Sequence, residues 1–219
     1  MDKPFLIYEY RRAEFRDLGA IAQLGHDFFG SESFRRGLVG RELYITRLWE
    51  RNNRVFWVLE YRNPAVLSAK RIVGYTSILP EVPDIAMLHR GGAFDQYTMQ
   101  PQLIVGGDER NDALRPTFYV QAVAVTERHN RTHAAITERD HMIAHHVADL
   151  LKQTSTQDFR CLAESFSGAG RNFMEKHGFK PNDVESPTNH KIYLFRSEDP
   201  DLPRRGREML AEVNALRAA

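Results

Sequence analysis

A run of eight residues, FYVQAVAV (118–125), constrains the fold more than any other stretch of the chain. Apart from Gln121, it holds only β-branched, aromatic and small side chains. Such a run is typical of a strand in the middle of a sheet, with both faces covered. The sequence therefore predicts a buried central strand, and the neighbouring elements must supply the two layers that cover it.

The residues after this strand change to a helical period of hydrophobicity. Thr137 followed by Asp140 is typical of a capped helix N-terminus directly after a polar turn. A strand that enters a helix through such a turn leaves free N–H groups and the positive end of the helix dipole pointing outward. We therefore expect an anion here, and first of all the phosphate of a ligand. The apolar side of the helix holds Ile136, Ile143, Val147, Leu150 and Leu151.

The remaining helices and strands are predicted from the same two patterns, a helical period of hydrophobicity and the apolar or alternating runs that are typical of strands. We expect helices within 15–30, within 41–52, within 170–181 and in the tail 199–219, and further strands at 5–10, 55–61, 71–80, 159–165 and 191–196. The apolar side of the second helix would hold Leu43, Ile45, Leu48 and Trp49. The resulting order is β-α-α-β-β-(insertion)-β-α-β-α-β plus a C-terminal helix. We predict a single α/β domain over 1–219, with a mixed, mostly antiparallel sheet flanked by helices.

The insertion, residues 81–116, is longer than a hairpin connection needs. DIAMLHRGGAFDQYT (84–98) favours a short helix, and QLIVGG (102–107) favours a short strand. Long insertions in compact domains are usually functional or mobile. Three interpretations stay open: a lid on the substrate side, a contact in a homodimer, and a connection without a role.

Composition excludes several classes of protein. The chain of 219 residues is 42% hydrophobic and 27% charged, which is ordinary for a soluble globular protein. Its formal net charge of +1 provides no long-range attraction to nucleic acid or to anionic lipid. No apolar stretch is long enough to cross a bilayer, and the first residues do not begin a signal peptide. Because Cys161 is the only cysteine, no internal disulfide forms. We expect a cytoplasmic protein with neither nucleic acid nor membrane as a partner.

The segment 118–179 resembles the GNAT superfamily of acyl-CoA N-acyltransferases. Strand, turn, helix, strand and helix follow in that family's order, and FMEKHGF (173–179) is the most specific part of the match. The resemblance in element order extends over 5–196. It implies transfer of an acyl group, most simply acetyl, from acyl-CoA to a small-molecule or peptide amine, without a metal. It also implies that the backbone of Val123 and Val125 binds the pantetheine arm, and that the turn from Asn130 to Ala135 binds the pyrophosphate.

This turn departs from the family pattern because it lacks glycine. Counted directly from Val125, the matching positions are Asn130, His133 and Ala135; with one residue inserted they are Arg131 and Ala134. Side-chain charge, such as that of Arg131, would then replace backbone amides around a phosphate, and the alternative is a solvated loop. The cofactor-binding candidates are Val123, Val125, Asn130, Arg131, Thr132, His133, Ala134, Ala135 and Ser167, the last at the position of a family asparagine.

Gln121 and Glu164 are the candidate catalytic residues. Gln121 either polarises the acceptor or orders a water, or else it only bonds to a strand edge. Glu164 is suited by residue type to act as a base. Met174 stands where the family often has a tyrosine as general acid, and methionine cannot donate a proton.

Two other side-chain patterns suggest chemistry that we do not expect. Cys161 lies between Phe159 and Ala163 in a strand, which favours a buried, inert thiol. His141 and His145 share a helix face, but neither an HExxH pattern nor a third ligand accompanies them, so no metal is expected.

Three hypotheses for function remain open. The first is the acyl-CoA N-acyltransferase. The second is a GNAT-fold binding or regulatory module without catalysis, favoured by the absence of both the glycines and the tyrosine. The third is an acyltransferase that uses acyl carrier protein, which the insertion supports. The layout of 74–94 is also similar to acyl-homoserine lactone synthases, whose catalytic Glu and nearby Arg would fall at Tyr119 and Ala122.

Overall fold

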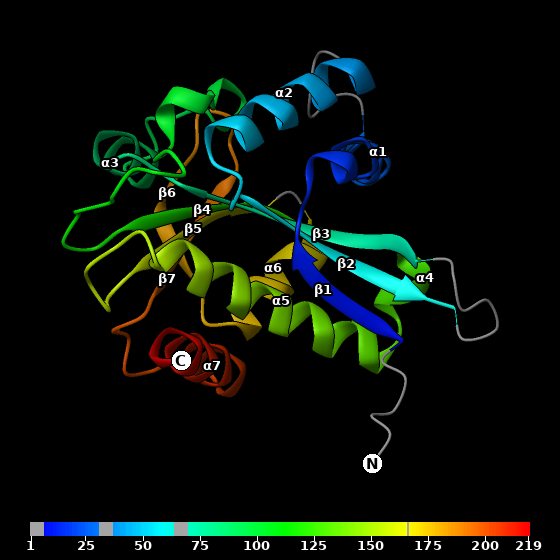
Figure 1. The fold of residues 1–219 in the computed structure, drawn as a ribbon. Helices are drawn as coiled ribbons and strands as arrows, with labels where there is room; N and C mark the ends of the chain where they lie inside the picture. Colours follow the sequence, from blue (N-terminus) through cyan, green and yellow to red (C-terminus); the bar gives the residue numbers. More distant parts are fainter. Residues whose placement is uncertain (1–6, 31–36, 64–69, 166) are drawn as a thin grey trace.

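The strands of the protein form one sheet in the order β1, β2, β3, β4, β5, β7, β6 (Figure 1). The computed structural model describes residues 7–30, 37–63, 70–165 and 167–219. Only β4 and β5 pair in parallel, and the other neighbours are antiparallel. The predicted α/β class with a mixed, mostly antiparallel sheet is confirmed. The strands are β1 (Tyr8–Arg12), β2 (Phe56–Arg62), β3 (Lys70–Pro80), β4 (Thr117–Val125), β5 (Arg160–Ser165), β6 (Lys180–Glu185) and β7 (Lys191–Arg196).

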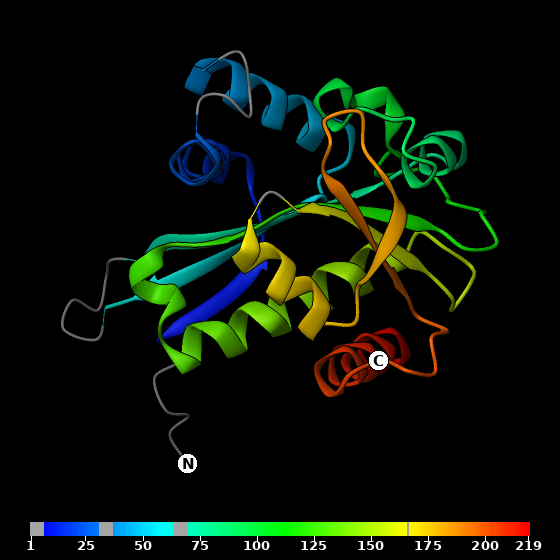
Figure 2. The same cartoon turned by 180° about the vertical axis from the view of Figure 1, so that it is seen from behind.

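Helices cover both faces of this sheet (Figures 1 and 2). One face carries α1 (Leu18–Phe29), α2 (Gly37–Arg51) and α3 (Pro83–Arg90). The other face carries α5 (His133–Leu151), α6 (Gly168–Lys176) and α7 (Arg204–Ala218). The short α4 (Glu127–Asn130) follows β4, and single 3-10 turns are η1 (Phe15–Asp17), η2 (Gln96–Thr98) and η3 (Pro101–Leu103). In the described ranges, no helix is long and apolar enough to cross a membrane.

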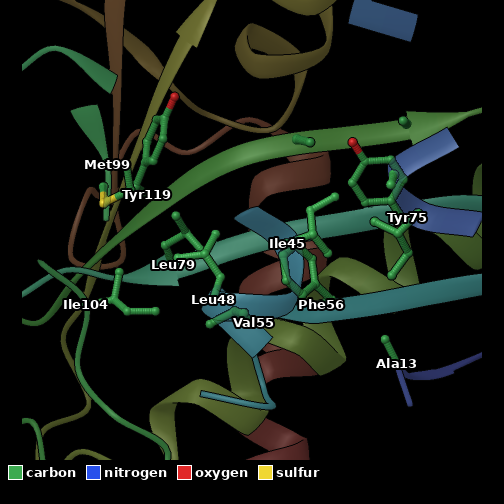
Figure 3. Close-up of a cluster of buried hydrophobic side chains, with 14 of the residues drawn as sticks. Ala13, Ile45, Leu48, Val55, Phe56, Tyr75, Leu79, Met99, Ile104 and Tyr119 are labelled. Atoms are coloured by element: carbon green, nitrogen blue, oxygen red, sulfur yellow. The ribbon is translucent and has the colours of Figure 1, made fainter. Parts of the chain in front are cut away.

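The central strand β4 is covered on both faces, as its composition predicts. Phe118 belongs to the buried cluster beneath α5, α6 and α7, while the next residue, Tyr119, belongs to the cluster beneath α1 and α2. The second cluster brings together Leu48 of α2 with Phe56 and Leu79 of the sheet (Figure 3). Successive side chains of a strand point to opposite faces, so one apolar run can serve two cores.

The start of α5 corrects the predicted cap. The helix begins at His133, and the Thr132 hydroxyl accepts a hydrogen bond of 3.2 Å from the amide of Ala135. Thr137, predicted as the cap, lies inside the helix. Both threonines suit an N-cap by residue type, but only Thr132 has the extended backbone that a cap requires.

Two further expectations differ from the structure, and one strand was not expected at all. Leu43 of α2 is 50% exposed, and the helix buries Arg41 together with Ile45 and Leu48. The segment 102–107 forms no strand: it follows η3 and makes one isolated bridge, between Glu81 and Ile104. Strand β6 was not predicted, because its sequence KPNDVE is polar and carries a proline. It lies at the sheet edge, where proline is tolerated.

β4 and β5 separate part of the way along their length. Residues Thr117 to Val120 pair with Arg160 to Ala163, whereas β4 continues to Val125. On the β3 side, Ser77 pairs with Ala122 and Ile78 with Val120, so Gln121 is the extra residue of a β-bulge. Because a bulge bends its strand and increases its local twist, β4 leaves β5 at Gln121. The strands therefore enclose a gap in the middle of the sheet.

Candidate functional site

A cavity of about 530 Å³ occupies the gap between β4 and β5. Its volume lies within the range of roughly 300–1,000 Å³ that small-molecule and cofactor sites have. Helices α1 and α2 line the cavity from one face of the sheet, and α5 and α6 line it from the other. The remaining lining residues belong to the strands β2, β3, β4 and β5, to η2 and α4, or, like Phe179, to a connecting segment. The cavity can therefore bring together two ligands that approach from opposite faces.

The end of the cavity beside α5 and α6 carries a fixed cation, Arg139. Its side chain is only 12% exposed, and its guanidinium lies 4.8 Å from the centre of the Phe173 ring. It donates hydrogen bonds to Asp140 at 2.7 Å and to the Asn130 side chain at 3.3 Å. Ser167 lies at the same end and caps α6 by accepting from the amide of Gly170 at 3.1 Å. This end therefore offers a guanidinium and polar groups to an anionic ligand.

The middle of the cavity is formed by the part of β4 that has left β5. Val123, Val125 and Gln121 all line it. The Gln121 side chain is held at both ends, since its amide nitrogen donates to the Tyr44 hydroxyl at 2.8 Å and its oxygen accepts from the Ser77 hydroxyl at 3.0 Å. The amide is therefore a fixed dipole beside the gap.

The end beside α1 and α2 is aromatic. Tyr44 and Tyr75 lie here, and burial raises the pKa of both hydroxyls, so they stay protonated at neutral pH. The buried Arg41 brings a positive charge to this end. Among the described residues, the aromatic side chains that line this end are Phe28, Phe29, Tyr44, Phe56, Tyr75 and Tyr97.

Glu164 belongs to a buried charge cluster rather than to the cavity surface. Its carboxylate accepts from His89 Nε2 at 3.1 Å, and His89 Nδ1 lies 2.6 Å from Glu81. The Glu164 residue is 8% exposed but its side chain is 0% exposed, so only its main chain reaches the cavity. A carboxylate so placed cannot contact a ligand directly, and the geometry does not support the predicted role of Glu164 as a base.

Electrostatics hold this cluster together. Burial by itself lowers the pKa of His89, but hydrogen bonds to Glu164 and Glu81 outweigh it and raise the pKa to about 9. Burial raises the pKa of Glu81, and the hydrogen bond to His89 opposes that rise. His89 is therefore a cation at neutral pH, between the carboxyl groups of Glu81 and Glu164.

The remaining predicted residues of the turn do not line the cavity. Arg131 is 76% exposed and pairs with Glu127, and the exposed His133 lies 3.4 Å from the Thr137 hydroxyl. Thr132 caps α5 and Ala134 is exposed, while Ala135 is fully buried in a cluster against β1, β2 and β3. Of the residues predicted for the turn, the structure brings only Asn130 to the cavity.

The remaining candidate groups are the cysteine, the histidine pair of α5 and Met174. Cys161 is buried, and burial raises the pKa of its thiol. His141 lies 2.7 Å from Glu212 of α7, and His145 lies 3.9 Å from it. Across the residues that the structure describes, no three His, Cys, Asp or Glu side chains are grouped to hold a metal ion. Met174 lines the cavity, at the family position of the tyrosine.

Sequence reasoning missed Arg139 and Arg41. Arg139 lies three residues after Ile136 and four before Ile143, so it shares the helix side of the apolar stripe. A cation on an apolar stripe was the available signal. The sequence signal for Arg41 was weaker, because this residue begins the stretch that was expected to be helical. Only the packing of α2 shows that Arg41 is buried.

Known proteins resemble this chain in structure but not in sequence. No protein-family model matches the chain, and no curated protein matches it. Among solved structures, apo FdhC, described as a nucleotide-linked sugar GNAT, is 10% identical with a TM-score of 0.53, over 97% of this chain and 94% of its own.

Two further solved structures are similar. A chain of the NatC complex bound to Gag peptide and CoA is 10% identical with a TM-score of 0.51, over 86% of this chain and 96% of its own. An uncharacterised protein from Bacillus halodurans is 8% identical with a TM-score of 0.52, over 96% of this chain and 91% of its own. At such low identity these likenesses establish the fold alone. The chain has the GNAT fold.

Proposed function

We propose that the protein transfers an acyl group, most simply acetyl, from acyl-CoA to an amine. The observation that carries the proposal is the cavity at the separation of β4 from β5, lined from both faces of the sheet. In this proposal the thioester arm lies along Val123 and Val125, and the acceptor approaches from α1 and α2. Two ligands held in this way meet in the gap, and positioning supplies much of the acceleration of such a bimolecular reaction.

The α5 and α6 end is suited to the charged part of the coenzyme. Arg139 is held there by Asp140 and by the ring of Phe173, and guanidinium groups form charge-assisted hydrogen bonds to phosphate. Asn130 and Ser167 lie at the same end. We therefore assign the phosphate contacts to Arg139 and Asn130 rather than to Arg131.

The cavity offers few groups that could transfer a proton during this reaction. The amine loses a proton as it attacks the thioester carbonyl carbon, and the departing thiolate takes one up. Among the described residues that line the cavity, Glu164 is the only carboxylate, and its side chain is buried away from the surface. The chain thus positions the reactants and polarises them through Gln121, and water carries the protons.

Calorimetric titration with acetyl-CoA tests the proposal. We expect binding by the native protein, and we expect Arg139→Gln to weaken it about 10- to 100-fold, which corresponds to the 1.5–3 kcal/mol of a charged hydrogen bond. The matched control is Arg204→Gln, because Arg204 is an exposed arginine of α7 that does not line the cavity. Loss of binding in Arg131→Ala with full binding in Arg139→Gln would instead favour the turn predicted from sequence. Absence of acetyl-CoA binding by the native protein would refute the proposal.

A GNAT-fold binding module without catalysis is a second candidate. Met174 in place of a proton donor, and the burial of the Glu164 carboxylate, both favour it. A panel of amines separates the two functions. Tight acetyl-CoA binding without release of free thiol for any amine would support the module, whereas thiol release that depends on an amine would support the enzyme. A cytoplasmic location, a single domain and use of acyl carrier protein stay predictions.

A further inference from the structure

We propose that the acceptor is an amine with a single positive charge on an apolar body about the size of a ring, as in an arylethylamine. This inference rests on the proposed acyltransferase function and specifies its second substrate. It follows from three features of the cavity beside α1 and α2. These are the aromatic side chains at its opening, the lack of an accessible carboxylate among the described lining residues, and the contact between its wall and the reacting gap.

The first feature is a group of aromatic side chains at the opening of the cavity, which we call the aromatic mouth. Phe28 is 43% exposed, Phe29 37% and Tyr97 47%, and all three line the cavity. The two phenylalanines end α1, whereas Tyr97 belongs to η2 of the insertion. Apolar side chains that gather at one opening and stay exposed are typical of a ligand site. A ligand in the cavity can therefore cover ring surface that the protein alone leaves in water.

The side chains deeper in the same end continue this apolar surface. Phe56 is 1% exposed and Tyr75 4%, and both line the cavity (Figure 3). Aromatic side chains pack well on another ring, edge-to-face or offset. The whole cavity measures about 530 Å³, and an apolar pocket of roughly 150 Å³ accepts a benzene molecule. A ring therefore fits at this end beside the thioester arm.

The second feature is the lack of an accessible negative charge. Glu164 is the only acidic residue among the described residues that line the cavity, and its side chain is 0% exposed. Burial raises the pKa of Tyr44 and of Tyr75, so neither hydroxyl becomes an anion at neutral pH. A second ammonium group on the acceptor would therefore find no carboxylate here, and burial of an unpaired charge is unfavourable. This arrangement disfavours a polyamine and favours an acceptor whose one charged group is the amine that reacts.

The third feature joins this end of the cavity to the reacting gap. The Tyr44 hydroxyl accepts a hydrogen bond of 2.8 Å from Gln121, the bulged residue at which β4 leaves β5. A ring between the aromatic mouth and Tyr44 would therefore extend its amine toward the gap. There the unprotonated nitrogen forms a bond to the thioester carbonyl carbon as the carbon–sulfur bond breaks. The nitrogen gives up one proton and the thiolate takes one up, so the reaction needs no further reactant.

Three primary amines test the inference with acetyl-CoA: 2-phenylethylamine, 1,4-diaminobutane and 3-amino-1-propanol. The diamine is the sharpest competitor, because aromatic rings also attract cations. Release of coenzyme A thiol measures turnover. We expect kcat/KM for 2-phenylethylamine to exceed that of the other two about tenfold or more, since several rings contact the substrate. Equal or faster turnover of the diamine or of the amino alcohol would overturn the inference.

Two variants assign the preference to the aromatic mouth. Phe28→Ala and Tyr97→Ala should each lower the ratio of kcat/KM for 2-phenylethylamine to kcat/KM for the amino alcohol about 2- to 10-fold, the range for one aromatic pair. A general loss of activity cancels in this ratio. The matched control is Phe15→Ala, because Phe15 is 61% exposed and does not line the cavity, and it should keep the native ratio. A native ratio in both folded variants would overturn the assignment.

A binding measurement separates this inference from the proposed function. With coenzyme A present, we would compare the thermal stabilisation by N-(2-phenylethyl)acetamide with that by N-(3-hydroxypropyl)acetamide, which requires no chemistry. Stabilisation by the aromatic compound alone supports the ring site even if no amine is acetylated, in which case only the enzyme function fails. Equal stabilisation, or none by either compound, contradicts the ring site.

Discussion

The buried cluster of Glu81, His89 and Glu164 predicts a stability that falls as the pH rises above neutral. Both contacts of the imidazole join side chains that are 0% exposed. The His89 ring also lies edge-on to Tyr119, 4.6 Å between ring centres, so no water reaches it from that side. The cluster ties α3 of the insertion to the end of β3 and to β5. The insertion is thus held to the sheet by charge, and one protonation governs that contact.

The magnitude follows from the pKa of His89, which the structure raises from 6.5 to about 9. The folded protein keeps a proton that the unfolded chain loses near pH 6.5. The stabilisation is therefore complete below pH 6.5 and is lost as the pH rises to about 9. A difference of this size corresponds to about 3 kcal/mol of unfolding free energy. The raised pKa of Glu81 gives a slope of the same sign, beginning from its ordinary value of 4.5.

Urea unfolding at pH 6.5, 7.5, 8.5 and 9.5 measures this effect. We expect the native protein to lose about 3 kcal/mol across the series. His89→Gln should lose about 3–5 kcal/mol at pH 6.5, because removal of one partner leaves buried carboxylates without their cation. The difference in unfolding free energy between the native protein and this variant should then shrink toward pH 9.5.

The control is His133→Gln, an exposed histidine near the start of α5, which should follow the native curve. A native protein whose stability is flat from pH 6.5 to 9.5 would refute the protonated cluster. A His89→Gln variant that keeps the native slope would assign the slope to other groups, with Glu81 the first to examine.

Two further predictions concern stability and reactivity. Asp149 is 6% exposed and contacts Arg12 and Arg54 at 2.7 Å each, so Asp149→Ala should cost about 3 kcal/mol in urea unfolding, the low end for a broken buried ion pair. Glu208→Ala removes an exposed helix pair and should cost under about 1 kcal/mol; equal costs for the two variants would contradict the reasoning. Because burial raises the pKa of the Cys161 thiol, a thiol reagent should label it only after unfolding, and Cys161→Ala should retain native turnover. Rapid labelling of the folded protein would contradict the buried position.

The pattern of hydrophobicity was enough to predict most of the fold. The runs that became β3, β4, β5 and β7 were recognisable because a strand that packs on both faces, or alternates between them, leaves a local signature. The helix α5 was recognisable for the same reason, through the stripe that includes Ile143 and Val147. Secondary structure of this kind depends on neighbours in the chain, so the sequence alone contains the information.

The misplaced elements had no local signature. KPNDVE is a strand because β7 lies beside it, and Thr132 rather than Thr137 caps α5 because the backbone changes from extended to helical at Thr132. Leu43 was expected in the core and faces solvent, since the burial of α2 depends on which side meets the sheet. Pairing partners and helix rotation are long-range properties, which periodicity does not contain.

In the candidate site, too, some features were predictable from the sequence and others were not. Gln121, Val123, Val125 and the family order of elements were visible in the sequence, because one strand carries them. The bulge that separates β4 from β5, and the burial of the Glu164 carboxylate against His89 some 75 positions earlier, appear only when the sheet is assembled. Residue types determined which chemistry was available to this protein. Only the tertiary structure decided which groups face the cavity, because that depends on contacts between residues far apart in the chain.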